Sequence, residues 1–274
     1  MPFGFYIIMA AQFFSALADN ALLIAAIAAL REMQAPAEYE PLLKTFFTVS
    51  YVLLAAFVGA FADSMPKWRV MFISNAIKIA GCSMMFFGAH PLIAYAVVGL
   101  GAAAYSPAKY GILTEYLPHR LLVVANGWIE GLTVGAIILG VVVGGMLIRP
   151  DISQALLGFD FPLIDTGIDT VGEMAIGIVG VFYIIASLFN LYVPDTGVDH
   201  KPLKKNPIYL IHEFKHCVAL LWRDKLGQIS LAVTTLFWGA GATLQFIVIK
   251  WSEVALGLDL SKASMLQGVV AVGV

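Results

Sequence analysis

Charged side chains are scarce in this chain. Only 12% of its 274 residues are Asp, Glu, Lys or Arg, whereas 60% are hydrophobic, and the mean hydropathy is +0.87. Soluble domains carry roughly 25% charged residues, so the chain has too little charge to cover a water-facing surface. This deficit excludes a soluble enzyme.

A basic surplus and a cysteine framework are also absent. The formal net charge is −2, whereas domains that bind nucleic acid show clustered positive charge, so we expect no nucleic-acid partner. The two cysteines, Cys82 and Cys217, lie far apart and form no CxxC pair, which excludes a disulfide framework and a cysteine zinc site. We expect neither a metal nor a cofactor.

Long apolar stretches are what the chain does contain. A helix that crosses the ~30 Å hydrocarbon layer needs about 20 mostly apolar residues. Seven stretches reach or approach that length, at residues 5–30, 42–62, 70–88, 91–113, 121–148, 174–193 and 226–250. An eighth begins near Ser261 and is still apolar at Val274, so we expect the chain to be a fragment of a longer protein.

The order of these stretches predicts an all-α polytopic membrane protein. Residues 1–193 would form an N-terminal six-helix transmembrane bundle, and residues 226–274 the start of a second bundle with the seventh helix and part of the eighth. Residues 194–225 form a polar linker punctuated by Pro and Gly. Two bundles joined in this way are typical of transporters with repeated halves.

Lys and Arg are shared unequally between alternate loops. One side has Lys67, Arg69, Arg120, Lys201, Lys204, Lys205, Lys215, Arg223 and Lys225, and the other has Arg31, Lys44, Arg149, Lys250 and Lys262. Because cytoplasmic loops are enriched in Lys and Arg, the sequence predicts that the N-terminus and the linker are cytoplasmic.

One metal-binding pattern lies in the linker. Residues 212–216, HEFKH, satisfy HExxH, which on a helix places two imidazoles on one face for zinc. A catalytic zinc site also needs a third ligand, so a membrane metalloprotease is only an alternative here. An apolar stripe at helical spacing favours an amphipathic helix on the bilayer surface: Ile208, Ile211, Phe214, Val218 and Leu221.

Four ionisable side chains lie well inside the predicted spans, where a charge is costly and usually faces a cavity or a partner. They are Asp19, Lys78, Lys109 and Glu130, and together with Asn20 they are our candidate substrate-binding residues. Structural alternatives exist: a buried hydrogen-bonded pair for Asp19 and Asn20, and snorkelling for Lys78. Lys109 contacts either the substrate or only the carboxylates of Asp19 and Glu130. Glu130 either contacts the substrate or a proton, or has a buried packing role.

The turn at residues 59–69, GAFADSMPKWR, resembles the loop signature of the major facilitator superfamily. Four residues match the signature: Gly59, Asp63, Lys67 and Arg69. Pro66 stands where the signature usually has Gly. Asp63 at a helix end can pair with either basic residue and lock a cytoplasmic gate in one state; the alternative is a capped turn without a gating role.

Three segments resemble the bacterial lysophospholipid transporter family within that superfamily. They are residues 11–23 (AQFFSALADNALL), 99–113 (GLGAAAYSPAKYGIL) and 237–244 (FWGAGATL). The resemblance implies a multi-pass flippase of the bacterial inner membrane, not an enzyme. Such a protein moves lysophosphatidylethanolamine-type lipids from the outer to the inner leaflet by alternating access, with a functional link to a lysolipid acyltransferase.

The resemblance also implies that Asp19 and Asn20 bind the headgroup. That headgroup carries an ammonium and a phosphate, so it needs an acceptor and a donor in a cavity of low dielectric. We expect Asp19 and Asn20 to hold the ammonium, and Lys109 or Lys78 to meet the phosphate. The acyl chain would lie against aromatic helix faces beside that cavity: Phe13, Phe14 and Trp238.

A second transporter function stays open. In a proton-coupled small-solute or drug exporter, Asp19 and Glu130 would be the proton sites. The sequence determines neither the energy coupling nor the headgroup selectivity.

Overall fold

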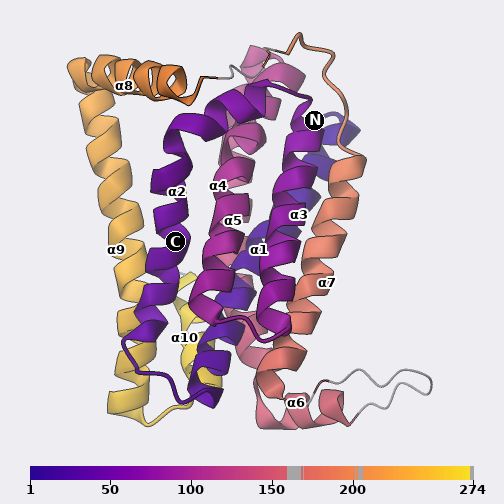
Figure 1. The fold of residues 1–274 in the computed structure, drawn as a ribbon, viewed down its shortest axis with the longest axis vertical. Coiled ribbons are helices and arrows are strands. Elements are labelled where there is room, and N and C mark those ends of the chain that lie inside the picture. Colours follow the sequence, from indigo (N-terminus) through magenta and orange to yellow (C-terminus); the bar gives the residue numbers. More distant parts are fainter. Residues whose placement is uncertain (159–167, 169, 201, 203–205, 272–274) are drawn as a thin grey trace.

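The computed structural model describes residues 1–158, 168, 170–200, 202 and 206–271, which form ten α-helices (Figure 1). The helices are α1 (Phe3–Glu32), α2 (Tyr39–Asp63), α3 (Lys67–Phe86), α4 (Pro91–Tyr116), α5 (His119–Leu147), α6 (Pro150–Leu157), α7 (Val171–Leu191), α8 (Pro207–Arg223), α9 (Lys225–Leu256) and α10 (Leu260–Ala271). The prediction of an all-helical chain is confirmed. The last residues of the predicted eighth span, 272–274, and the linker residues 201 and 203–205 lie outside the described residues.

Six of the described helices are long and apolar enough to cross a membrane: α1, α2, α4, α5, α7 and α9. The predicted span at residues 70–88 corresponds to α3, which does not qualify by length and composition. Polar residues such as Asn75 and Lys78 lower its hydropathy, yet α3 packs along α4 and α7 inside the bundle. The short helix α6 has only 8 residues and was not among the predicted elements.

Local signals explain several helix ends. Thr170 and Glu173 form a reciprocal capping box at the start of α7, where each side chain binds the backbone N–H of the other. Gly257 has a φ of 64°, which lets the chain leave α9 and turn into α10.

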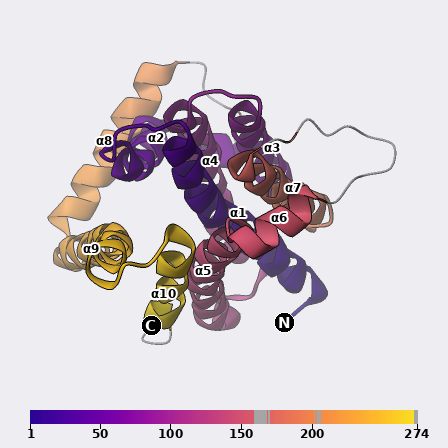
Figure 2. The same ribbon diagram turned by 90° about the horizontal axis from the view of Figure 1, so that it is seen from below.

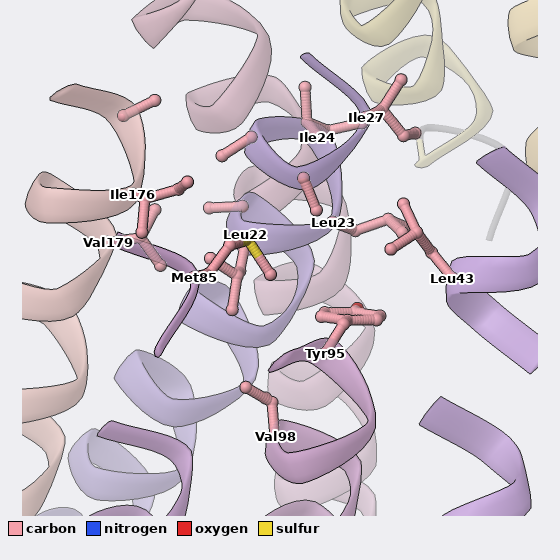
Figure 3. Close-up of a cluster of buried hydrophobic side chains, with 14 of the residues drawn as sticks. Leu22, Leu23, Ile24, Ile27, Leu43, Met85, Tyr95, Val98, Ile176 and Val179 are labelled. Atoms are coloured by element: carbon pink, nitrogen blue, oxygen red, sulfur yellow. The ribbon is translucent and has the colours of Figure 1, made fainter. Parts of the chain in front are cut away.

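Helix α1 lies near the centre of the bundle and packs along α5 and α7, while α4 lies between α2 and α3 (Figure 2). The main apolar cluster surrounds the second half of α1 with side chains from α2, α3, α4 and α7 (Figure 3). Its labelled members are Leu22, Leu23, Ile24, Ile27, Leu43, Met85, Tyr95, Val98, Ile176 and Val179. Burial of α1 on all sides fixes the position of the polar residues that it carries.

Glycines allow α5 to approach α1 closely. A Cβ atom at Gly140 would lie 2.4 Å from the backbone oxygen of Leu17, and one at Gly144 would lie 2.9 Å from that of Ala21. The same spacing continues at Gly127, Gly131 and Gly135, but there no described atom lies within 4 Å of the Cβ position. Only the second half of this glycine ridge therefore packs against a described helix.

Helix α8 lies at the edge of one end of the bundle, beside α2 and almost perpendicular to α9 (Figure 1). Its only buried residue is Leu210, and most of its apolar side chains are exposed. We call this the α8 end of the bundle and the opposite one the α6 end. At the α6 end, α10 packs against α5 and joins α9.

Candidate functional site

Asp19 and Lys78 form an ion pair in the interior of the bundle. The Lys78 Nζ atom lies 2.7 Å from Oδ2 of Asp19, and the two side chains are 2% and 15% exposed. An ammonium buried this deeply needs its charge neutralised, and the Asp19 carboxylate does so directly. The structure thus joins two residues that the sequence placed 59 positions apart.

Hydrogen bonds with three other side chains hold this pair in place. The Tyr183 hydroxyl donates to Oδ1 of Asp19 (2.8 Å), and the Tyr95 hydroxyl donates to its backbone oxygen (3.0 Å). Lys78 also donates to the Ser15 hydroxyl at 2.9 Å. Both carboxylate oxygens therefore have a fixed donor, which orients Asp19 for recognition of a further cation.

Lys109 has a different environment. Its side chain is 5% exposed, and its ammonium lies 4.3 Å from the centre of the Tyr110 ring. Within the described residues its ammonium forms no hydrogen bond or salt bridge, although it interacts electrostatically with Asp19, Lys78 and Glu130. Lys109 is therefore a buried donor that remains available to an anionic ligand.

Glu130 lies beside this lysine but bonds elsewhere. Its Oε1 atom accepts a hydrogen bond of 2.5 Å from the Tyr110 hydroxyl, which connects α5 to α4. The aromatic ring of Tyr110 thus contacts Lys109 while its hydroxyl contacts Glu130. The three residues form one unit at the α4–α5 contact.

Asn20 points away from the Asp19 carboxylate. Its Nδ2 atom donates to the backbone oxygen of Ala16 at 2.9 Å, and the side chain is 7% exposed beside Gly140 of α5. Consecutive helix residues face directions about 100° apart, which separates the two side chains.

The loop signature forms a network at the α8 end. Lys67 is 5% exposed, and its ammonium donates to Oδ1 of Asp63 (2.8 Å) and to the backbone oxygen of Ala62 (2.7 Å), and lies 3.3 Å from Oε1 of Glu115. Of the two basic residues expected near Asp63, Lys67 is thus the one that pairs with it. Arg69 is exposed over the Trp68 ring, and a Cβ at Gly59 would meet no described atom within 4 Å.

A second ion-pair network lies at the α6 end. Arg31 of α1 donates to both carboxylate oxygens of Glu40 in α2, at 2.8 and 3.0 Å. Its third nitrogen lies 2.7 Å from Oε1 of Glu253 in α9. Among the described residues, this is the ion pair that joins the first six-helix segment to α9.

The HExxH pattern lies on α8. His212, Glu213 and His216 are all exposed, and no group of three or more His, Cys, Asp or Glu side chains suited to a metal occurs within the described residues. The pattern has no further ligand in this part of the structure.

Several residues of the site were not predicted from the sequence. Ser15 lies one helical turn before Asp19, and this spacing could have indicated it. Tyr183 and Glu115 gave no such signal, because their partners are distant in the sequence and meet them only through helix packing.

Comparison with known proteins identifies the family. Residues 8–274 match the profile of the Major Facilitator Superfamily. The chain belongs to the Major Facilitator Superfamily. It is therefore a multi-pass membrane protein of a transporter family, and the predicted fold class is confirmed.

Within the superfamily, the chain is similar to proteins named lysophospholipid transporter LplT. The protein of Yersinia enterocolitica is 40% identical over 272 residues, which cover 99% of this chain and 62% of the relative. The protein of Yersinia pestis (strain Pestoides F) is 40% identical over 268 residues, or 97% of this chain and 61% of the relative. The chain thus spans about 61–62% of the length of these relatives, and the resemblance seen in three segments extends over nearly all of it.

Proposed function

We propose that this chain belongs to a lysophospholipid transporter that moves lysophosphatidylethanolamine-type lipids from the outer to the inner leaflet of the bacterial inner membrane. The observation that carries the proposal is the 40% identity to LplT proteins over nearly the whole chain. Residues 1–193 would be its first bundle, 194–225 its linker and 226–274 the start of its second bundle.

Two charges of opposite sign in the site suit a zwitterionic headgroup. Asp19 offers a carboxylate held by Lys78 and Tyr183, and Lys109 offers a buried ammonium with no protein acceptor among the described residues. The lipid ammonium would bind at Asp19 and the lipid phosphate at Lys109, since hydrogen bonds between charged groups are about twice as strong as neutral ones.

The remaining candidate residues would support these two. Lys78 would position the Asp19 carboxylate, and Glu130 would orient Lys109 through Tyr110. Asn20 would set the approach of α1 to α5 beside the headgroup site, because it packs against Gly140. Phe13, Phe14 and Trp238 would contact the acyl chain.

The gating residues fit alternating access with the N-terminus in the cytoplasm. The α8 end would then be cytoplasmic, with the Asp63, Lys67 and Glu115 network at the inner gate and Arg31 at the outer one. Lipid delivered to the inner leaflet would be the substrate of a lysolipid acyltransferase, which makes such an enzyme the expected functional partner.

The test is inward movement of labelled lysophosphatidylethanolamine in spheroplasts that express the full-length protein. Asp19→Asn should abolish movement above background, whereas Asp199→Asn, an exposed aspartate of the linker, should leave it unchanged. Movement of a water-soluble substrate that requires a pH gradient, with no lysolipid movement, would instead favour the small-solute exporter.

A further inference from the structure

A cluster of buried polar side chains between α3, α4 and α7 has atoms without protein partners. Ser74, Asn75 and Asn190 are 0% exposed, Tyr105 is 3% exposed and Ser187 is 6% exposed. Within the described residues nothing pairs with the hydroxyls of Ser74, Tyr105 and Ser187, with Nδ2 of Asn75, or with either amide atom of Asn190. An unpaired buried polar group destabilises the fold, so this many together point to a polar ligand.

The α7 members face the ion pair of the site. Tyr183, Ser187 and Asn190 recur at helical spacing and so lie on one face of α7. Tyr183 donates to the Asp19 carboxylate at 2.8 Å, which fixes the direction of that face toward α1 and α3. Ser187 and Asn190 therefore point into the same interior, one and two turns nearer the α8 end.

The α3 members face the same interior from the opposite side. Lys78 binds Asp19, and Ser74 and Asn75 lie one turn nearer the α8 end on the same face of α3. Asn75 accepts a hydrogen bond of 2.8 Å from Ser15, which is also a partner of Lys78. The α3 and α7 faces therefore meet, because the two helices pack side by side.

Two ring contacts link the helices that carry these members. Phe14, the neighbour of Ser15, stacks on Phe189, the neighbour of Asn190, with 5.8 Å between ring centres. The Tyr105 ring lies 5.2 Å from the Lys78 ammonium. The partnerless atoms thus form one group next to the ion pair.

The chemistry of the group selects its ligand. The Lys78 ammonium faces the group, and none of its five members carries a carboxylate, which disfavours a metal cation. The members include both donors and acceptors, and small neutral side chains dominate. A water molecule matches these properties, since internal waters typically form about three hydrogen bonds with otherwise unpaired groups.

We propose that Ser74, Asn75, Tyr105, Ser187 and Asn190 bind a chain of internal water molecules. This chain runs from the Asp19 and Lys78 pair toward the α8 end, inside the first bundle rather than between the two bundles. It hydrates the buried ion pair.

Radiolytic hydroxyl-radical footprinting of the full-length protein tests this assignment, because bound water generates radicals at its own position. Met71 is 0% exposed and belongs to the same buried cluster as Tyr105, so these two residues report on the polar group. Met85 is buried to a similar extent, at 4%, in the main apolar cluster and is the matched control. Met71 and Tyr105 should be oxidised several-fold faster than Met85.

A variant locates the water. Asn190→Leu keeps the side-chain size but removes both polar atoms, and should lower oxidation of Met71 and Tyr105 several-fold without changing Met85. Asn126→Leu, the same substitution at an exposed position of α5, should change none of the three. Equal oxidation of probes and control in the unmodified protein, or probe rates unchanged by Asn190→Leu, would overturn the proposal.

Discussion

Arg31 and Glu253 connect α1 to α9. Nη1 of Arg31, at the end of α1, lies 2.7 Å from Oε1 of Glu253, near the end of α9. Arg31 is at the same time bound by both oxygens of Glu40. This contact closes the α6 end, where Ile249 and Ser252 of α9 are also buried. Most of the other residues of α9 are exposed, so among the described residues this helix is buried mainly at the α6 end.

Loss of the Arg31 contact should favour opening at the α6 end. Arg31→Gln removes a partly exposed ion-pair network worth about 1 kcal/mol, or roughly a fivefold change in the conformational equilibrium. Thiol labelling of a cysteine introduced at Ser252, which is 0% exposed, should become faster by that factor in the full-length protein.

The matched control removes the other cation near Glu253, Lys250. Lys250 lies 3.9 Å from Glu253 and is 66% exposed, so Lys250→Gln should leave the labelling rate unchanged. Equal labelling in Arg31→Gln and in the parent protein would show that the contact does not hold the α6 end closed.

Removal of Lys78 alone should be more damaging than removal of the whole pair. Lys78→Met leaves the Asp19 carboxylate buried without its cation, which typically costs about 3–5 kcal/mol. Asp19→Asn together with Lys78→Met removes both charges and should recover much of that loss. Unfolding midpoints in detergent measure this double-mutant cycle, and additive losses would contradict the pairing.

The sequence predicts the helices of this protein better than the contacts between them. Hydropathy located nearly every long helix, because the need to satisfy the backbone inside lipid leaves few alternatives. It also located α3, whose polar face is buried against α4 and α7, but it gave no signal for the eight residues of α6.

The cost of burying a charge singled out Asp19, Lys78 and Lys109 from the sequence alone. The same argument did not indicate which of them pair, because pairing depends on how α1, α3 and α7 pack. Tyr183 is 164 positions from Asp19, and no local pattern connects them. The family resemblance grouped Asn20 with Asp19, yet the Asn20 side chain bonds within α1.

The two basic residues of the loop signature should differ in importance. Lys67 is buried with three acceptors, so Lys67→Met should lower the free energy of unfolding by about 1–3 kcal/mol. Arg69 is exposed and only stacks on Trp68, so Arg69→Met should change stability by less than about 0.5 kcal/mol. Thermal unfolding of the two variants side by side provides the comparison, and equal losses would contradict the role given to Lys67.

Lys109 should affect substrates that carry a phosphate. Lys109→Gln removes one charged hydrogen bond to the headgroup, worth about 2 kcal/mol, and should weaken lysophosphatidylethanolamine binding roughly thirtyfold. Lys225→Gln, at an exposed lysine, should have no effect. Binding of a monoacylglycerol, which lacks the phosphate, should be the same in both variants; an equal loss for that lipid would mean that Lys109 has a structural role only.

The most direct measurement is the inward movement of labelled lysophosphatidylethanolamine by the full-length protein, compared with Asp19→Asn at equal membrane abundance. The account predicts movement well above background that disappears in Asp19→Asn and persists in Asp199→Asn. Absence of movement in a well-inserted protein, or undiminished movement in Asp19→Asn, would contradict it.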